Sequence, residues 1–198
     1  MVLESLEDFD DALTVFSLLG DRRIGGHRLG AISNAGFECV AIADSLGMLE
    51  LADFSPATKA KLEEMFARAK VGEIVDVHNP LDLTPGSGDS GYIEGFRHIL
   101  EDPNIDCGVA GIVPLTPAMN SLAAGPDSHG EDVLRPGSLV EAYVRLMADS
   151  TKPWVASVDA GTPYDTLARG LEAGGVPVFR TVDRALRMLR LWIAAREA

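Results

Sequence analysis

The chain has 198 residues, of which 46% are hydrophobic, and a formal net charge of −13 at pH 7. This length lies near the upper end of a single domain and is long enough to bury a sizeable core. The acidic balance argues against a general nucleic-acid binder and against docking on an anionic membrane surface, because both need a basic face. It does not exclude a small anionic ligand, since local dipoles can act against the overall field.

The amino terminus is acidic and lacks the basic segment and apolar run of a signal peptide. No uninterrupted apolar stretch is long enough to cross a bilayer, so no membrane partner is expected. The two cysteines, Cys39 and Cys107, show no ligand spacing, which favours buried free thiols and a cytoplasmic location. The four histidines are scattered, so no metal site is expected.

The first predicted element is a helix over residues 6–19, with Ser5 as its amino-terminal cap and Gly20 as its stop. Apolar side chains recur along this helix at helical spacing. We expect the following four to form its inner stripe: Phe9, Leu13, Phe16 and Leu19. The polar segment that follows is expected to be a flexible link.

The next stretch, LGAISNAGFECVAIADSLG, predicts a buried strand over residues 29–33, a small-residue turn at 34–36, and a helix over 37–46. Apolar groups at Phe37, Val40 and Ala41 repeat about one turn apart. Such a turn aims backbone N–H groups past the carboxyl end of the strand, where the helix dipole favours an anion, often phosphate. The alternative is a tight strand–helix connection that binds nothing.

Strands and helices alternate along the rest of the chain. Strands are predicted over 48–52, 107–113, 154–158 and 176–179, and a short apolar piece lies at 74–77. Helices are predicted over 56–70, 92–101, 139–148, 164–173 and 182–195, with Asp89 or Ser90 capping the second of these. The alternation predicts a flavodoxin-like α/β fold: a three-layer sandwich of about five parallel strands in the order 2-1-3-4-5, with helices on both faces.

Isolated polar residues offer weaker signals. His129 lies in a long loop over residues 120–136, where a histidine can act as a base or accept a phosphoryl group, although a solvated role is more common. Asp76, Asp82 and Asp89 gather around one crossover, where they can hold a cation or make turns and caps. The chain contains no GxSxG elbow, Walker A loop or HExxH pattern.

An ordered set of segments resembles the CoA-ligase domain of the NDP-forming acyl-CoA synthetases, the superfamily of succinyl-CoA synthetase and the ADP-forming acetyl-CoA synthetases. The segments are SNAG at 33–36, Ala43-Asp44, HNPLDLTP at 78–85, Tyr92, EDPNIDCGVAGIVPLTP at 101–117, KPWVAS at 152–157 and GGVPVF at 174–179. The resemblance covers nearly the whole chain. It implies a single ligase-CoA-like domain over residues 1–198, with a helix and linker at 1–28 and a flavodoxin-like core at 29–198.

The resemblance also implies a setting in a larger enzyme that makes an acyl-CoA from an acid, CoA and a nucleoside triphosphate. By this resemblance, the complete enzyme uses phosphate, nucleotide and CoA. No tightly bound cofactor is expected on this chain. The phosphorylated histidine belongs to another domain of the family, because Ser128-His129-Gly130 lacks the family's Thr and lies elsewhere. CoA-binding and ATP-grasp domains or subunits are the implied partners, and a homo-oligomer is a further expectation. No catalytic residue is assigned to this chain, which is expected to show no turnover alone.

The resemblance assigns to this domain one half of a phosphate-binding site. A helix amino terminus of this domain and a partner helix both point at the phosphorylated histidine. The positions on this domain match Ser33, Asn34, Ala35, Gly36 and Phe37, with Asn79 and Asp82 in a loop near the site. The family usually continues TNAGGPG, whereas this chain has Phe37-Glu38-Cys39 after the turn. We expect Phe37 to narrow access and Glu38 to repel phosphate.

Two alternatives to the ligase domain stay open. The first is a non-catalytic interaction or regulatory domain that kept the fold and lost the phosphate site, which Glu38 supports. The second is a flavin or nucleotide binder of flavodoxin type, which the absence of a Ser/Thr-rich phosphate loop disfavours.

Overall fold

The structure is a computed structural model that describes residues 3, 5–20, 22–69, 76–125 and 129–197. Its sheet contains six parallel strands, which are β1 (Arg28–Ser33), β2 (Glu50–Leu51), β3 (Leu81–Asp82), β4 (Cys107–Ile112), β5 (Trp154–Val158) and β6 (Val178–Phe179). The order β2-β1-β4-β5-β6 is the predicted 2-1-3-4-5 arrangement, so the flavodoxin-like fold is confirmed. The additional strand β3 pairs with the carboxyl end of β1, beyond the end of β2.

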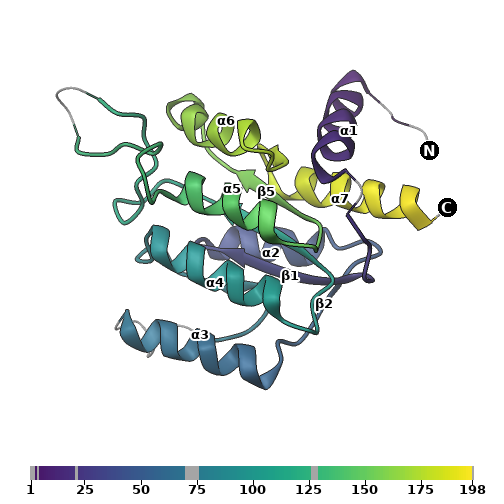
Figure 1. Cartoon of the computed structure of the whole chain (residues 1–198), viewed down its shortest axis with the longest axis horizontal. Helices are drawn as coiled ribbons and strands as arrows, with labels where there is room; N and C mark the ends of the chain where they lie inside the picture. Colours follow the sequence, from purple (N-terminus) through teal and green to yellow (C-terminus); the bar gives the residue numbers. More distant parts are fainter. Residues whose placement is uncertain (1–2, 4, 21, 70–75, 126–128, 198) are drawn as a thin grey trace.

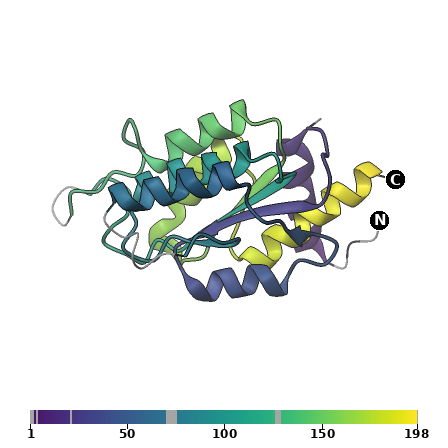
Figure 2. The same cartoon turned by 90° about the horizontal axis from the view of Figure 1, so that it is seen from below.

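Helices cover both faces of the sheet, as Figures 1 and 2 show. They are α1 (Leu6–Leu19), α2 (Gly36–Asp44), α3 (Pro56–Arg68), α4 (Asp89–Glu101), α5 (Leu139–Asp149), α6 (Asp165–Ala173) and α7 (Val182–Glu197), with a short 3-10 turn at Thr162–Tyr164. In Figure 2, α3 and α5 lie above the sheet, whereas α2 and α7 lie below it. The amino-terminal helix α1 packs on α7, outside these layers.

The apolar strands explain the three layers, because β4 and β5 are buried along their whole length and need a cover on both faces. Between the sheet and helices α4 and α5, the rings of Phe96, Tyr143 and Trp154 pack with centroid separations of 5.1–5.7 Å. Both cysteines are free thiols, with Cys107 buried and Cys39 half-buried, close to the sequence expectation.

The predicted inner stripe of α1 is wrong at two positions, because Phe9 and Leu13 are exposed. The buried residues of this helix are instead Asp8, Ala12, Val15 and Leu19. Ion pairs set this rotation: the Asp8 carboxylate accepts hydrogen bonds of 2.8 and 2.7 Å from Arg187 of α7, and Arg184 pairs with Glu7 and Asp11. A pattern within one helix does not show where a distant helix places its arginines.

Most helix ends agree with the sequence. Ser5 caps α1 and Gly20 ends it in a left-handed conformation (φ 53°), both as predicted. The predicted cap of α4 is wrong, because Gly88 is the cap residue and Asp89 lies within the helix, where its carboxylate accepts from Asn120 N at 3.0 Å. Of the predicted apolar piece at 74–77, residues 74 and 75 lie outside the described residues, and 76 and 77 are not in a strand.

Candidate functional site

The predicted phosphate site lies where β1 ends and α2 begins. The cap residue of α2, Ala35, is extended (φ −137°, ψ 120°) and supplies no capping side chain. The N–H groups of Glu38 and Cys39 bond to Ala35 O at 3.0 and 3.1 Å, whereas Gly36 and Phe37 are exposed to solvent. In the described part of the chain, the N–H groups of Gly36 and Phe37 have no hydrogen-bond partner, so both can receive an anion.

The uncapped turn of α2 differs from the starts of three other helices, whereas α4 and α6 likewise begin without a side-chain cap. Serine hydroxyls cap α1, α3 and α5 through Ser5, Ser55 and Ser138, each accepting a hydrogen bond from the first turn. Because α2 carries no such acceptor, its first turn keeps the donors and the positive dipole end that a bound anion would use.

The expectation that Phe37 narrows access to the turn stays a prediction. Its side chain is 61% exposed, so it is not packed into the core. Val40, one turn later, is also exposed. The two side chains therefore form an apolar surface beside the free amides, and the inward positions of α2 are Glu38 and Ile42.

The Asn34 side chain has a structural role. Its Nδ2 donates to Val113 O at 2.9 Å, and its Oδ1 accepts from Val113 N at 3.2 Å, which joins the ends of β1 and β4. Its N–H donates to the Tyr92 hydroxyl at 3.0 Å. That hydroxyl lies 2.8 Å from Asn34 Oδ1 and 2.7 Å from Gly111 O, either of which can accept its proton. These bonds hold the turn rigid at the carboxyl edge of the sheet.

Glu38 is turned into the protein and not toward a ligand. The residue is only 1% exposed, and its carboxylate accepts hydrogen bonds from Ser33 Oγ at 2.6 Å and Ser157 Oγ at 2.8 Å. It lies against Gly111 of β4, where any Cβ would overlap the carboxylate oxygens. Burial raises the pKa of Glu38, the two serine hydrogen bonds oppose this shift, and the charge of Asp159 adds to it.

Sequence reasoning placed Glu38 correctly in the first turn but missed its direction and its partners. Ser157 and Gly111 come from β5 and β4, more than 70 residues away along the chain. One signal was available: a glycine inside a buried strand, as in Cys-Gly-Val-Ala-Gly-Ile, often marks a close approach of another group.

The two residues predicted to lie in a loop near the site, Asn79 and Asp82, occupy different places in the structure. Asp82 lies opposite Ser33 in the β1–β3 pairing, and a Cβ on Gly36 would lie 3.4 Å from its Oδ2, so Asp82 lies beside the turn. Asn79 lies beside β1 on the side away from the turn. Its Nδ2 donates to Leu29 O at 2.6 Å and to Ala52 O at 2.9 Å, and its Oδ1 accepts from Ala31 N. Asn79 thus joins β1 to the segment after β2.

The charge around the turn is negative. The pKa of the Cys39 thiol is raised to about 12, first by burial and then by the charges of Asp82 and Glu38. The dipole of α2 and its free amides act against this field, so the site offers hydrogen-bond donors but little positive charge. An anion bound here needs cations from elsewhere or a strong geometric fit.

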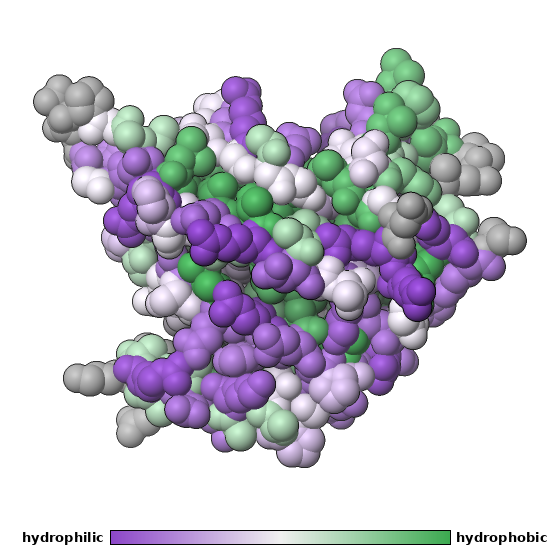
Figure 3. All heavy atoms as spheres, in the orientation of Figure 1, coloured by the Kyte–Doolittle hydropathy of each residue, from purple (hydrophilic) through white to green (hydrophobic). Residues whose placement is uncertain are grey.

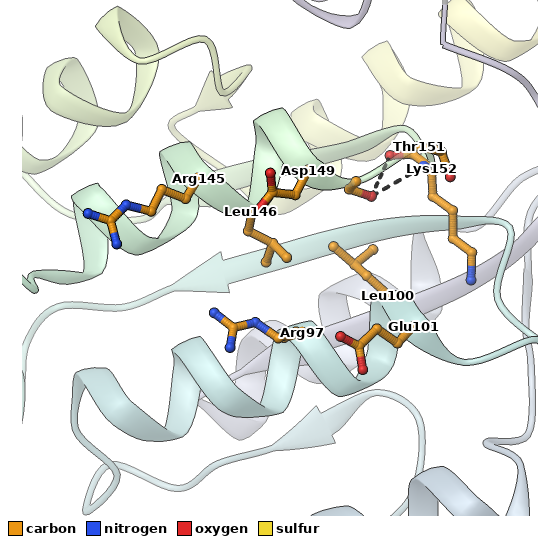
Figure 4. Close-up of a pocket in the computed structure, with 9 residues that line it drawn as sticks. Arg97, Leu100, Glu101, Arg145, Leu146, Asp149, Thr151 and Lys152 are labelled. Atoms are coloured by element: carbon orange, nitrogen blue, oxygen red, sulfur yellow. Dashed lines mark hydrogen bonds between the residues drawn. The ribbon is translucent and has the colours of Figure 1, made fainter.

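A separate groove of about 440 Å³ lies between α4 and α5 (Figure 4). Thr151 and Lys152, which precede β5, line one end, so this groove reaches the amino edge of the sheet, opposite the α2 turn. His129 accepts a hydrogen bond from Glu131 N at 3.3 Å within its own loop. Among the described residues, no cluster of three or more His, Cys, Asp or Glu side chains could hold a metal ion. Within that same part, no helix is long and apolar enough to span a membrane.

The fold and the open helix turn at its carboxyl edge define an α/β domain of the flavodoxin-like class. No protein-family model matches the chain. The chain is 27% identical over 156 residues to the alpha subunit of an ADP-forming acetate–CoA ligase II from Pyrococcus furiosus, a match that covers 78% of this chain and 30% of the relative. This similarity agrees with the resemblance to the NDP-forming acyl-CoA synthetases that the sequence indicates.

Solved structures confirm the fold. A protein from Pyrococcus horikoshii OT3 matches with a TM-score of 0.73 and 23% identity over 99% of this chain and 41% of that chain. The dinucleotide-forming acetyl-coenzyme A synthetase 1 of Ca. Korarchaeum cryptofilum, in complex with phosphate and ADP, matches with a TM-score of 0.73 and 21% identity over 98% of this chain and 39% of that chain. The chain therefore spans less than half of the length of these proteins.

Proposed function

We propose that the chain acts as the ligase-CoA-like domain of an NDP-forming acyl-CoA synthetase, and that the first turn of α2 receives a phosphoryl group. The observation that carries the proposal is the uncapped, solvent-exposed turn at Gly36 and Phe37, at the carboxyl edge of a parallel sheet. Parallel α/β sheets bind their ligands at this edge. The similarity to an ADP-forming acetate–CoA ligase subunit supplies the chemical setting.

The proposal assigns no catalytic side chain to this domain. The histidine that carries the phosphoryl group, the ATP-grasp domain and the CoA-binding domain belong to other parts of the enzyme. Phe37 and Val40 lie exposed beside the free amides and offer an apolar surface on which such a domain can dock. We infer a cytoplasmic setting, in line with the free thiols of Cys39 and Cys107.

A titration with inorganic phosphate, followed by ¹⁵N NMR of the whole chain, tests the phosphate site. We expect saturable shifts at the amides of Gly36 and Phe37. The variant Ala35→Asn adds a neutral cap that can accept from the Phe37 amide and leaves the Gly36 amide free, so it should weaken phosphate binding, reduce the shift of the Phe37 amide and stabilise the fold by about 0.5–1 kcal/mol. The matched variant Val40→Asp adds a charge on the exposed face without capping the turn, and it should weaken binding without abolishing it.

An affinity for phosphate in Ala35→Asn equal to that of the unmodified chain would contradict a site at these amides. Their absence from the unmodified chain would favour a non-catalytic interaction domain, which the acidic surroundings of Asp82 and Glu38 make the main rival. Acyl-CoA formation by the chain alone would contradict the assignment of the catalytic groups to other domains. A coloured purified protein would point to a flavin binder instead.

A further inference from the structure

Glu38 is a buried carboxyl group to which the proposed function gives no role, although it belongs to the first turn of α2. Its two carboxylate oxygens accept hydrogen bonds from the hydroxyls of Ser33 and Ser157. Within the part of the chain that the structure describes, no Lys, Arg or His side chain forms a hydrogen bond or ion pair with this carboxylate. Its negative charge is therefore stabilised by hydroxyl dipoles and not by a cation.

Two hydrogen bonds connect the Glu38 carboxylate to the turn. Ser33 Oγ donates to Glu38 Oε2 at 2.6 Å and accepts from the N–H of Ala35 at 3.2 Å. The carboxylate oxygen and the Ala35 nitrogen are thus no farther apart than these two bonds together allow. The amides of Gly36 and Phe37 follow directly along the chain. An anion bound to these amides consequently lies close to a second negative charge inside the protein.

Burial makes the charge of Glu38 effective over this distance, because salt and water screen a buried charge much less than an exposed one. Asp82, the other carboxylate beside the turn, is only half-buried, so the solvent screens it more. An anion and a carboxylate about 7 Å apart, at an effective dielectric constant of about 20–40, repel each other enough to weaken binding roughly 10-fold or more for each charge on the anion.

Further ionisable side chains face Glu38 or the turn from the elements around them: Cys39 of α2, Asp82 of β3, Tyr92 of α4 and Asp159 after β5. Burial raises the pKa of the thiol to about 12 and the pKa of the phenol well above its ordinary value, so neither is charged near neutral pH. Both aspartates add negative charge. Helix α7 also packs on α2, and its Arg190 lies against Gly47, beyond the carboxyl end of α2.

We propose that Glu38 selects the ligand of the α2 turn by charge. When its carboxylate is ionised, the turn accepts oxyanions with one negative charge in preference to those with two, and an oxyanion with two charges binds together with a proton on Glu38. Glu38 does not touch the ligand and acts through its field as a specificity-determining residue. The proposal rests on the anion site proposed at α2 and specifies its ligand: a phosphoryl group that reaches the turn with two charges brings a proton with it.

Sulfate and methanesulfonate are matched probes, because both present tetrahedral sulfur–oxygen groups and keep two charges and one charge, respectively, at every pH used. Their binding to the whole chain is followed by ¹⁵N NMR at the amides of Gly36 and Phe37, at pH 8 and constant ionic strength. Relative to wild type, Glu38→Gln should raise the affinity for sulfate about 100-fold and the affinity for methanesulfonate about 10-fold. The preference between the two anions should thus shift about 10-fold toward sulfate.

Glu63→Gln is the matched control, because it makes the same chemical change at an exposed position of α3. Helix α3 lies on the other face of the sheet from α2 (Figure 2), and many hydrophilic side chains cover it at the bottom of Figure 3. Its charge is thus remote from the turn and screened by solvent. Glu63→Gln should leave both affinities unchanged.

A second measurement uses the wild-type chain and does not depend on the folding of a variant. Coupling between two binding events is reciprocal, so saturating sulfate should raise the pKa of Glu38, measured from the ¹³C resonance of its carboxyl group. Saturating methanesulfonate should raise this pKa less. In agreement, the affinity for sulfate should fall as the pH rises through the pKa of Glu38, and the affinity for methanesulfonate should fall less.

The outcomes separate this proposal from the anion site itself. Saturable binding with the same ratio of the two affinities in wild type and Glu38→Gln would overturn the proposal and leave the anion site in place. A pKa of Glu38 that saturating sulfate does not change, or an equal effect of Glu63→Gln, would do the same. Sulfate binding by Glu38→Gln alone would support the proposal. Binding of neither anion to either chain would remove the anion site and the proposal together.

Discussion

Removal of the Glu38 carboxyl group is predicted to destabilise the fold. This group of α2 contacts the carboxyl-terminal parts of three strands, β1, β4 and β5. In Glu38→Ala, the hydroxyls of Ser33 and Ser157 lose their acceptor inside the protein. Each buried hydroxyl left without a partner costs about 1–3 kcal/mol, and the cavity over Gly111 adds to this. The variant regains some free energy because no carboxyl group is buried, so we expect a net loss of about 2–4 kcal/mol.

Glu38→Gln separates the shape of the side chain from its charge. The amide keeps the volume and can bond to both hydroxyls after these rotate, so at pH 5 we expect a loss of no more than about 1 kcal/mol. The raised pKa of Glu38 in the folded state means that its contribution is fully present below the unfolded-state pKa. That contribution declines as the pH rises through the folded-state pKa, so Glu38→Gln should gain stability relative to the wild-type chain toward pH 8.

Urea unfolding followed by tryptophan fluorescence measures these differences, since Trp154 and Trp192 are fully buried. The control is Glu63→Ala on the exposed face of α3, which should change the free energy of unfolding by no more than about 0.5 kcal/mol. A Glu38→Ala variant as stable as this control would refute the reasoning. A difference between Glu38→Gln and wild type that does not change with pH would refute its electrostatic part.

Three further predictions concern the same edge of the sheet and the thiols. Gly111→Ala should cost about 1–3 kcal/mol in urea unfolding, because its Cβ overlaps the Glu38 carboxylate, and the loss should shrink in a Glu38→Ala background. Tyr92→Phe should cost about 1–3 kcal/mol, because its buried hydroxyl bridges the ends of β1 and β4. Neither Cys39 nor Cys107, each with a pKa raised to about 12, should react rapidly with a thiol reagent at pH 8 until the chain is unfolded.

Controls for these predictions come from the same chain. Gly130→Ala lies in open space and should leave stability within about 0.5 kcal/mol of wild type, in contrast to Gly111→Ala. An additive double variant of Gly111 and Glu38 would contradict a direct clash. A Tyr92→Phe variant of wild-type stability would show that solvent replaces the hydroxyl, and fast thiol labelling of the native protein would contradict the burial of the cysteines.

The sequence by itself determined the architecture. The alternation of short apolar strands with helical repeats indicates a parallel α/β sheet, and five strands fit the flavodoxin-like order that the structure has. Local chemistry also located Ser5 and Gly20 at the ends of α1, because a cap depends on the few residues around it. The turn at Asn34–Gly36 was likewise placed at the carboxyl edge of the sheet.

Only the tertiary structure decided which side of helices α1 and α2 faces inward. Helix α1 turns three of its acidic residues toward Arg184 and Arg187, which lie more than 170 residues away, and this leaves Phe9 and Leu13 exposed. Helix α2 buries Glu38, because Ser157 donates to it and Gly111 leaves room. Periodicity reports how apolar groups repeat along a helix, whereas the inward side depends on polar partners that the fold brings together from remote segments.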